Sequence, residues 1–335
     1  MRSITNILVT GGAGFIGSSF VRTLLENEEF KGRVVTLDAL TYAADLSLLE
    51  NLDEQRHRFV CGSICDHRLV EKLCTEEEID TIVNFAAETH VDRSITTALP
   101  FFETNVMGTL NLLEVVRKFP HIHFHHISTD EVYGSLGKSG FFNECSPYRP
   151  NSPYAASKAA SDHIVHSFAH TYKLSTTLSH CCNNYGPGQY PEKFIPLVII
   201  HALTKKQIPI YGTGENVRDW IYVDDHSSAI WHILKEGKRS EPYDIGGMNE
   251  CSNLDLLQRL LPLIAEESGE SLEQLQEMIH CVPDRPGHDF RYAIDSRKIR
   301  KALSWRPKIS FVDGLRNTVK WYLSRVIQYE NLGHR

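Results

Sequence analysis

Three side chains that could act together in catalysis follow one predicted strand. The run 123–127 is typical of a strand that enters a sheet, and it leads to a hydroxyl, Thr129, and two carboxylates, Asp130 and Glu131. In open α/β sheets, ligands bind beyond the carboxyl ends of the strands. Neighbouring carboxylates push their pKa values apart, so that one can act as an acid and the other as a base. Taken alone, the same run would equally suit a solvated loop with a helix-capping aspartate.

A tyrosine and a lysine form the second candidate group. Tyr154 and Lys158 follow a polar, proline-rich loop at 143–153 and begin a predicted helix, where a spacing of four places both on one face. A lysine ammonium beside a phenol lowers the pKa of the phenol. Tyr154 could then accept a proton from a substrate hydroxyl while a hydride leaves the same carbon. This pair alone is common by chance and gains weight only together with a dinucleotide-binding loop.

Such a loop follows the first predicted strand, at 7–10. It leads into the pattern G-x-x-G-x-x-G and then into a predicted helix at 18–26. The loop allows backbone N–H groups and the positive end of the helix to approach a pyrophosphate. The second predicted strand, 33–37, ends at Asp38, where a carboxylate would bond the adenosine ribose and repel a 2′-phosphate. The pattern therefore predicts NAD rather than NADP, although a surface aspartate in a turn would look the same. The glycines of the loop are Gly11, Gly14 and Gly17.

The predicted elements alternate between strands and helices. Further strands are expected at 58–61 and 81–87, and further helices at 67–74 and 102–119. This alternation predicts an α/β protein with a Rossmann-type doubly wound parallel sheet. Beyond residue 182 the pattern breaks into loops and helices, which favours a smaller C-terminal substrate-binding domain.

The composition restricts the partners and the compartment. The 335 residues carry a formal net charge of -7, which argues against nucleic acid or an anionic membrane surface as a partner. No apolar run has the length of a membrane helix, and no signal stretch precedes the first strand. The eight cysteines form no C-x-x-C, as expected of a reduced cytoplasmic protein. No metal is expected, because no carboxylate or thiol nearby completes a site with the histidines at 121, 123, 125 and 126.

Taken together, the motifs resemble those of the extended short-chain dehydrogenases/reductases, and more closely the nucleotide-sugar 4,6-dehydratases that act on dTDP-glucose. The resemblance covers Asn6 to Tyr322. Asp130 is the discriminating residue, because related epimerases lack the paired acids, whereas GDP-mannose dehydratases and UDP-glucuronate decarboxylases usually have T-S-E at this point. The motifs are TGGAGFIG (10–17), AAETHVDRS (86–94), STDEVYG (128–134), YAASK (154–158), NNYGP (183–187), PEKFIP (191–196), RDWIYVDDH (218–226) and DRPGHDFRYAID (284–295).

The resemblance implies an internal redox cycle in which NAD is retained as a prosthetic group. Tyr154 would deprotonate the sugar 4-hydroxyl while C4 gives a hydride to NAD, and Thr129 would share the hydrogen bond. Glu131 would remove the C5 proton, and protonated Asp130 would donate to the departing C6 hydroxyl. The hydride would then return to C6.

The resemblance also implies two sets of binding residues. Each cation among them, taken singly, would be better explained by an ordinary surface ion pair, although arginines in such motifs suit a diphosphate. NAD would be bound by Gly11, Gly14, Phe15, Ile16, Gly17, Asp38, Thr41, Ser63, Ile64, Phe85, Ala86, Ala87, Thr104, Tyr154, Lys158 and Asn184. The nucleotide sugar would be bound by Thr89, Thr129, Asn183, Lys193, Pro209, Tyr211, Arg218, Asn253, Arg285 and His288.

The family also provides expectations for the domains. The NAD-binding domain is expected at 1–182 with a return segment at about 217–245, and the nucleotide-sugar-binding domain at 183–216 and 246–330. Within the return segment, 220–223 is expected to rejoin the main sheet. Two helices of the Rossmann half, within 102–119 and 155–172, would form a homodimer.

Four positions depart from the usual pattern of the family. Ser63 replaces the aspartate that bonds the adenine amino group, and Ala39 replaces a lysine beside the ribose-binding carboxylate. Thr89 replaces a serine, and His180 replaces an arginine or asparagine. These changes affect the expected affinity for NAD and leave the catalytic groups intact.

Three alternatives to the conversion of dTDP-glucose into dTDP-4-keto-6-deoxyglucose remain open. The same chemistry on UDP-glucose is the nearest, because thymine and uracil differ by one methyl group, worth only about 1–3 kcal/mol in a pocket. A nucleotide-sugar C4 epimerase would have no need of Asp130 and Glu131. A non-catalytic NAD-binding scaffold would tend to lose Tyr154 or Lys158, and both are present.

Overall fold

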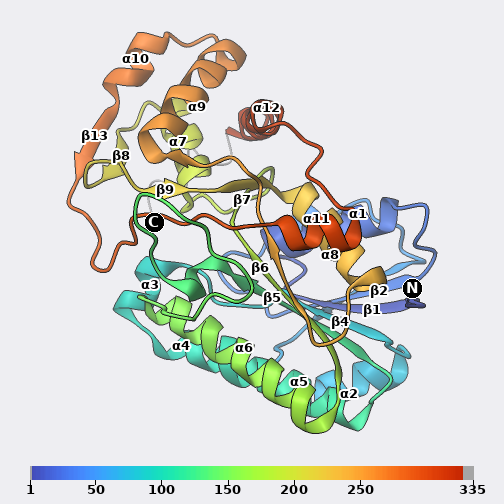
Figure 1. Cartoon of the computed structure of the whole chain (residues 1–335). Coiled ribbons are helices and arrows are strands. Elements are labelled where there is room, and N and C mark those ends of the chain that lie inside the picture. Colours follow the sequence, from blue (N-terminus) through green and yellow to red (C-terminus); the bar gives the residue numbers. More distant parts are fainter. Residues whose placement is uncertain (1, 327–335) are drawn as a thin grey trace.

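A seven-stranded sheet forms the centre of the molecule in the computed structural model, which describes residues 2–326 (Figure 1). Its order is β11-β6-β5-β4-β1-β2-β3, and every neighbouring pair is parallel. The order runs outward in both directions from β1 and β4, so the predicted doubly wound sheet is confirmed. Its strands are β1 (Asn6–Thr10), β2 (Arg33–Asp38), β3 (His57–Cys61), β4 (Thr81–Asn84), β5 (His123–Thr129), β6 (Ser175–Cys181) and β11 (Pro242–Ile245).

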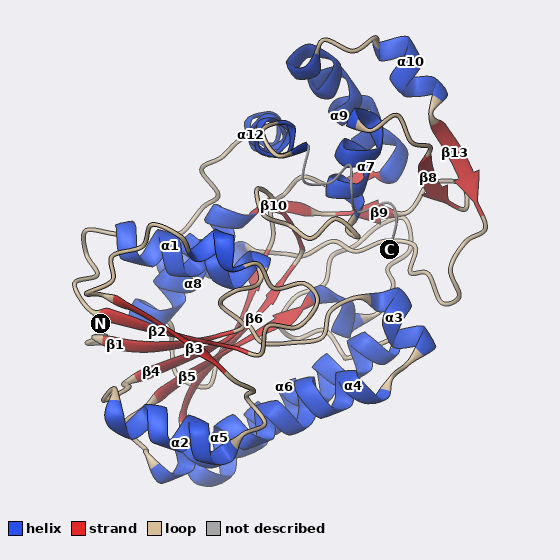
Figure 2. Cartoon of the chain, turned by 180° about the vertical axis from the view of Figure 1, so that it is seen from behind, coloured by secondary structure: helices blue, strands red, loops and turns tan. Residues whose placement is uncertain are grey.

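Helices cover both faces of this sheet, as the two opposite views show (Figures 1 and 2). Ile7 and Val9 of β1 face one core, whereas Leu8 between them faces the other. Because both faces are buried there, the central strand β1 is apolar from Ile7 to Val9. The first core contains α1 (Phe15–Glu26), α8 (Val223–Glu236) and α11 (Arg297–Leu303), and the second contains α2 (His67–Glu76), α5 (Thr109–Lys118) and α6 (Pro153–Tyr172).

The C-terminal part of the chain builds a separate hydrophobic core beside the sheet (Figure 1). Three two-stranded sheets accompany its helices, with the pairings β10-β7, β12-β9 and β13-β8. The helices are α7 (Phe194–Leu203), α9 (Asn253–Ser268), α10 (Leu272–Glu277) and α12 (Phe311–Leu323). The strands are β7 (Asn183–Tyr185), β8 (Ile208–Tyr211), β9 (Val217–Arg218), β10 (Trp220–Tyr222), β12 (Cys251–Ser252) and β13 (Ile279–Val282).

The expectation that 220–223 rejoins the main sheet is wrong. Trp220 and Tyr222 are buried in the C-terminal core, and β10 pairs with β7 instead. The chain returns to the main sheet one helix later, when β11 pairs with β6. The division into domains at 182/183, with 217–245 returning, stays a prediction, and its residues 327–330 lie outside the described part.

The helix predicted at 102–119 begins as a π-helix, η2 (Phe102–Gly108), and continues as α5. Such wider turns often occur at functional sites. In this one, buried Asn105 bonds the backbone N–H and C=O of Glu88, at 2.9 and 3.1 Å, and donates to Ser157 Oγ at 2.8 Å. Asn105 thus ties the loop after β4 to α6. The remaining short helices are η1 (Leu46–Leu49), α3 (Val91–Thr96), α4 (Leu99–Phe101) and η3 (Asp130–Tyr133).

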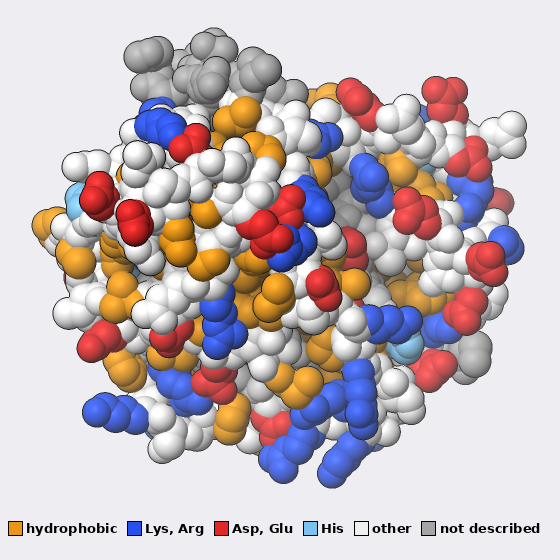
Figure 3. All heavy atoms as spheres, turned by 90° about the horizontal axis from the view of Figure 1, so that it is seen from above, with side chains coloured by type: hydrophobic (Ala, Val, Ile, Leu, Met, Phe, Trp, Pro, Cys, Tyr) orange, Lys and Arg blue, Asp and Glu red, His pale blue; other side chains and the backbone are white. Residues whose placement is uncertain are grey.

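The surface of the molecule carries charges of both signs. Acidic and basic side chains are interspersed over the face seen in Figure 3. Within residues 2–326, none of the helices combines the length and apolar character that crossing a membrane requires.

Candidate active site

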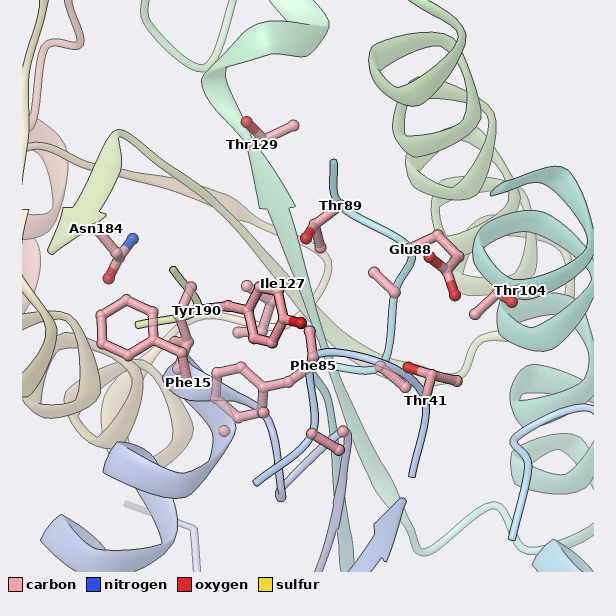
Figure 4. A pocket seen from close by; sticks show the side chains of 18 of the residues that line it. Phe15, Thr41, Phe85, Glu88, Thr89, Thr104, Ile127, Thr129, Asn184 and Tyr190 are labelled. Carbon is pink, nitrogen blue, oxygen red and sulfur yellow. The ribbon is translucent and has the colours of Figure 1, made fainter. Parts of the chain in front are cut away.

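A cavity of about 320 Å³ lies where loops from several strands of the main sheet meet (Figure 4). Its lining comes from the segments that follow β1 to β6, from β7 and the loop after it, and from η2 and α6. The strand order reverses between β1 and β4, which is the usual place for a ligand in an open parallel sheet. All residues predicted to act in catalysis and all residues predicted to bind the cofactor line this one cavity.

The glycine loop brings the start of α1 close to the backbone. Gly11 has φ +68°, a conformation that side chains disfavour, and a Cβ at Gly17 would lie 2.3 Å from the Gly11 carbonyl oxygen. The N-cap, Gly14, has no side chain to cap the helix. The first N–H groups of α1 are therefore left for an acceptor supplied from elsewhere, such as a phosphate.

Asp38 is held at the end of β2 by backbone donors. Its Oδ2 accepts from Ala13 N at 2.9 Å, and its Oδ1 accepts from Leu40 N at 2.8 Å. These bonds fix the carboxylate against the glycine loop. Their geometry suits a ribose-binding acid better than the alternative of a surface aspartate in a turn, since the side chain is 8% exposed.

Asn184 offers a buried acceptor on the other side of the cavity. Its Nδ2 donates to Cys182 O at 3.1 Å, whereas its Oδ1 is buried without a hydrogen-bond partner among residues 2–326. Figure 4 shows Asn184 on β7 and Thr129 at the end of β5. An unsatisfied buried oxygen is costly unless a ligand satisfies it. Together with the glycine loop and Asp38, it fits a dinucleotide that carries a carboxamide.

The two adjacent carboxylates begin the short helix η3. Thr129, not Asp130, is its N-cap, accepting from Glu131 N at 3.3 Å. Asp130 is 2% exposed, its Oδ1 accepts from Thr129 Oγ1 at 3.4 Å, and its Oδ2 has no partner in the described structure. The alternative of a solvated capping aspartate is therefore wrong.

The surroundings of Asp130 and Glu131 affect the pKa values of the two acids differently. Burial raises the pKa of Asp130 well above its usual value, and the neighbouring Glu131 charge adds to the rise. Burial also raises the pKa of Glu131, but the positive charges of Arg218, Lys193 and Arg285 oppose that rise. Asp130 is thus the better proton donor and Glu131 the better base.

Tyr154 and Lys158 lie in the first turns of α6, which is capped by Ser152 through a 3.1 Å bond from Ala155 N. Burial lowers the pKa of Lys158 to about 8, and its Nζ donates to Ile127 O at 2.7 Å. Burial, followed by the charge of Glu131, raises the pKa of Tyr154 well above its usual value. The expectation that Lys158 lowers the phenol pKa is not met, because its ammonium is directed to the Ile127 carbonyl.

The predicted substrate residues fall into two groups. Thr89, Thr129, Asn183 and Lys193 line the cavity, and Lys193 Nζ donates to Thr89 O at 3.2 Å. The other six do not line it. They are Pro209, Tyr211, Arg218, Asn253, Arg285 and His288.

The aromatic and cationic members of the second group partly contact one another. The Arg285 guanidinium lies 5.1 Å from the centre of the Tyr211 ring and 3.5 Å from a carboxylate oxygen of Asp92. The His288 ring lies 6.2 Å from Tyr211. Arg218 donates to backbone carbonyls and stacks over Tyr292 at 4.3 Å. Their contact with a substrate stays a prediction.

Several cavity residues were not singled out from the sequence. Glu88 and Glu192 lie inside motifs at 86–94 and 191–196, so their position in those motifs was the available signal. Tyr190 had no such signal. The polar and aromatic residues missed are Glu88, Ser128, Gln189, Tyr190 and Glu192.

A charged cluster lies behind the catalytic loop. His180 is enclosed by Asp162, at 3.3 Å, and Asp244, at 3.0 Å. Burial opposes its charge, but the hydrogen bonds and charges of the two carboxylates raise the pKa of His180 to about 9. Ser128 Oγ donates to Asp162 Oδ2 at 2.8 Å, and the Tyr133 hydroxyl donates to Asp244 Oδ1 at 2.9 Å.

The histidines of β5 have other partners. His125 bonds the hydroxyls of Thr177 and Ser179 at 2.8 and 3.2 Å, and His123 bonds those of Ser175 and Thr177 at 2.9 and 3.0 Å. Burial lowers the pKa of His125 well below its usual value, so this ring is neutral.

Comparison with known proteins agrees with this geometry. The family model described as GDP-mannose 4,6 dehydratase matches residues 8–318. A dTDP-glucose 4,6-dehydratase of Neisseria gonorrhoeae is 46% identical over 97% of this chain and 98% of its own. One of Xanthomonas campestris pv. campestris strain B100 is 49% identical over 95% and 93%. The chain belongs to the dTDP-glucose 4,6-dehydratase family.

A solved structure of this family has the same fold. The dTDP-glucose 4,6-dehydratase of Streptomyces venezuelae, with NAD and a dTDP ligand bound, superposes with a TM-score of 0.90. It is 44% identical, and the match covers 98% of this chain and 100% of that one. The resemblance inferred from the motifs is confirmed.

Proposed function

We propose that the protein is an NAD-dependent dTDP-glucose 4,6-dehydratase, a lyase that converts dTDP-glucose into dTDP-4-keto-6-deoxyglucose and water. The observation that carries this proposal is the acid pair of buried Asp130 and half-buried Glu131 in one cavity with Tyr154 and a glycine loop. An epimerase requires the tyrosine and the dinucleotide, whereas removal of water requires in addition an acid and a base.

The residues of the cavity suit NAD as the cofactor. The N–H groups after Gly14 would hold the pyrophosphate, Asp38 the adenosine ribose, and Asn184 Oδ1 the carboxamide. When bound, NAD supplies the acceptor for the hydride from sugar C4 and the donor that returns it to C6.

Side chains of the protein move the protons. Tyr154 would take the proton of the 4-hydroxyl as its phenolate, with Thr129 beside it and Lys158 on the next turn of α6. Burial and Glu131 favour the neutral phenol, and the positive charge of bound NAD would favour the phenolate. The 4-ketone acidifies C5–H, which Glu131 removes. Asp130, kept protonated by burial, donates to the C6 hydroxyl so that it leaves as water.

The substrate would extend from the cavity toward the C-terminal part. The sugar end of the substrate would contact Thr89, Asn183 and Lys193. The two arginines and His288 would then face the diphosphate, with Pro209, Tyr211 and Asn253 at the nucleotide. The charges of Arg218 and Arg285 that act on Glu131 support this direction.

We further propose a cytoplasmic homodimer. All eight cysteines are free thiols, which suits a reducing compartment. Exposed apolar side chains around α3 to η2 support a partner surface there, and light scattering after gel filtration would measure the mass. These residues are Ile95, Leu99, Phe102 and Met107.

One experiment separates the candidate functions. The purified protein, without added NAD, is incubated with dTDP-glucose and with UDP-glucose, and each sugar is followed by mass spectrometry. We expect loss of water from dTDP-glucose. Loss from UDP-glucose alone would change the substrate, whereas isomerisation at constant mass would indicate an epimerase. No reaction with either sugar, even after NAD is supplied, would favour a non-catalytic scaffold.

A further inference from the structure

A hydrogen bond joins two walls of the cavity that lie 150 residues apart in the chain. Tyr42 lies in the loop after β2, and its neighbours Thr41 and Ala43 line the cavity. Glu192 lies between β7 and α7 and also lines the cavity. The Tyr42 hydroxyl donates to Glu192 Oε1 at 2.8 Å. The two loops are therefore fastened to each other across the site.

Arg93 of α3, in the segment that follows the lining residues Glu88 and Thr89, joins this connection. Its guanidinium carbon lies 3.5 Å from the centre of the Tyr42 ring, and its Nε lies 3.5 Å from Glu192 Oε2. The ring of Tyr190, a lining residue, meets Tyr42 edge-on at 5.3 Å. Loops that follow β2, β4 and β7 thus converge on one cluster, which we call the strap: Tyr42, Arg93, Tyr190 and Glu192.

The bond at the centre of the strap is sheltered. The Glu192 side chain is 16% exposed, and a hydrogen bond to a carboxylate is among the stronger kinds. Burial and the bond to Glu192 raise the pKa of the Tyr42 phenol, so it stays a donor over the physiological range. The Arg93 cation stacks on the same ring, an arrangement that strengthens as water is excluded.

We propose that the strap retains NAD in the cavity between catalytic cycles. This inference rests on the proposed function, in which the hydride taken from C4 returns to C6 and the cofactor finishes each cycle as it began. Release of NAD therefore serves no purpose in the reaction. A dinucleotide lying between Asp38 and Asn184 would have to pass walls that the strap fastens together.

The test measures release of NAD directly. Protein loaded with radiolabelled NAD is chased with excess unlabelled NAD, and the bound label is followed by filtration for wild type, Tyr42→Phe and Glu192→Gln. We expect each variant to release NAD roughly tenfold faster or more, as for loss of a hydrogen bond to a charged group. The double variant should exceed Tyr42→Phe little, because Tyr42→Phe removes the bond and Glu192→Gln only weakens the same bond, leaving the phenol a neutral amide oxygen as its acceptor.

A matched control is Tyr172→Phe. Tyr172 is also stacked under an arginine, Arg117, at 4.9 Å, but it does not line the cavity. Its release rate should equal that of wild type. Thermal melting checks that each variant folds, and Tyr42→Phe, the smaller change, decides the matter if Glu192→Gln does not fold.

The outcomes distinguish the strap from the chemistry. The proposal would be overturned if both variants released NAD at rates within twofold of the wild-type rate. It would also be overturned if the control variant released NAD as fast as they do. Wild type that binds no labelled NAD would overturn the strap and the proposed cofactor together. Slow release from wild type, fast release from the variants and no loss of water from either sugar would support the strap and overturn the dehydratase.

Discussion

Two pairs of carboxylates lie near the end of β5, and the charges around the two pairs differ. Asp162 and Asp244 enclose His180 and share its positive charge. Asp130 and Glu131 form no ion pair with any residue of the described chain, although Asp130, Asp162 and Asp244 each have one buried oxygen without a hydrogen-bond partner there. The first pair is partly neutralised by a neighbouring cation, and the second is kept from ionising together by burial.

Carboxylates thus have a structural role in one pair and a reactive role in the other. A buried carboxylate with a cationic partner holds elements in place, but its pKa cannot be tuned without loss of that partner. A buried carboxylate without one has a raised pKa, which costs stability and gives a proton donor near neutral pH. The two pairs should therefore respond in opposite ways to mutation.

The largest expected effect is on catalysis. Asp130→Asn should lower the rate of water loss by about 10²–10⁴-fold, because the amide cannot donate the acidic proton. The free energy of unfolding should stay equal or rise, since position 130 no longer holds a buried acid. Mass spectrometry of the dTDP-sugar and urea unfolding would measure the two quantities. A rate within tenfold of wild type would show that Asp130 is not the acid.

The second effect is on stability. His180→Ala should lower the free energy of unfolding by about 3–5 kcal/mol, as for removal of one partner from a buried ion pair. Urea unfolding would measure the loss, with Asp130→Asn as the comparison. A loss below about 1 kcal/mol would mean that Asp162 and Asp244 do not depend on this cation.

A third effect is the pH dependence of stability. The pKa of His180 is about 9 in the folded protein and near 6.5 when unfolded, so the folded state binds the proton more tightly. This contribution is fully present below about pH 6.5 and is lost as pH rises through 9, amounting to about 3 kcal/mol. Urea unfolding from pH 6 to 10 should show this decline in wild type. The decline should be absent in His180→Asn; an identical profile in both proteins would contradict the assignment.

The smallest effect concerns an exposed carboxylate. Ser63→Asp restores the acid usual in the family at a solvent-exposed position of the cavity rim, where no burial cost arises. We expect NAD to bind about threefold to tenfold more tightly, as for one ordinary hydrogen bond at a solvent-exposed position. Titration calorimetry would measure the affinity, with Ser63→Ala as the control. Equal affinities in the three proteins would show that position 63 does not contact the adenine.

Much of the site could be predicted because its motifs are short and each follows a strand. The glycine loop, Asp38 and the run from Thr129 to Glu131 all end parallel strands, and a parallel sheet brings such ends to one edge. Local sequence therefore sufficed to bring these three segments together at the cavity.

Features that depend on packing between distant segments could not be predicted. The direction of the Lys158 ammonium is set by the Ile127 carbonyl, and β10 is drawn away from the main sheet by the burial of Trp220 and Tyr222. The His180 cluster unites residues from β6, α6 and β11, none of which carries a recognisable pattern. The strap likewise depends on how three loops meet.

The route of the chain between β6 and β11 has an evolutionary consequence. The chain leaves the main sheet after Cys181 and returns at Pro242, and Pro209, Tyr211 and Arg218 all lie in this excursion. Two of the residues proposed to hold the nucleotide, Pro209 and Tyr211, are thus separated from those proposed to perform the chemistry. Changes in the excursion could alter which base is accepted while the hydride and proton steps stay as they are, so that one catalytic sheet could serve a series of related sugars.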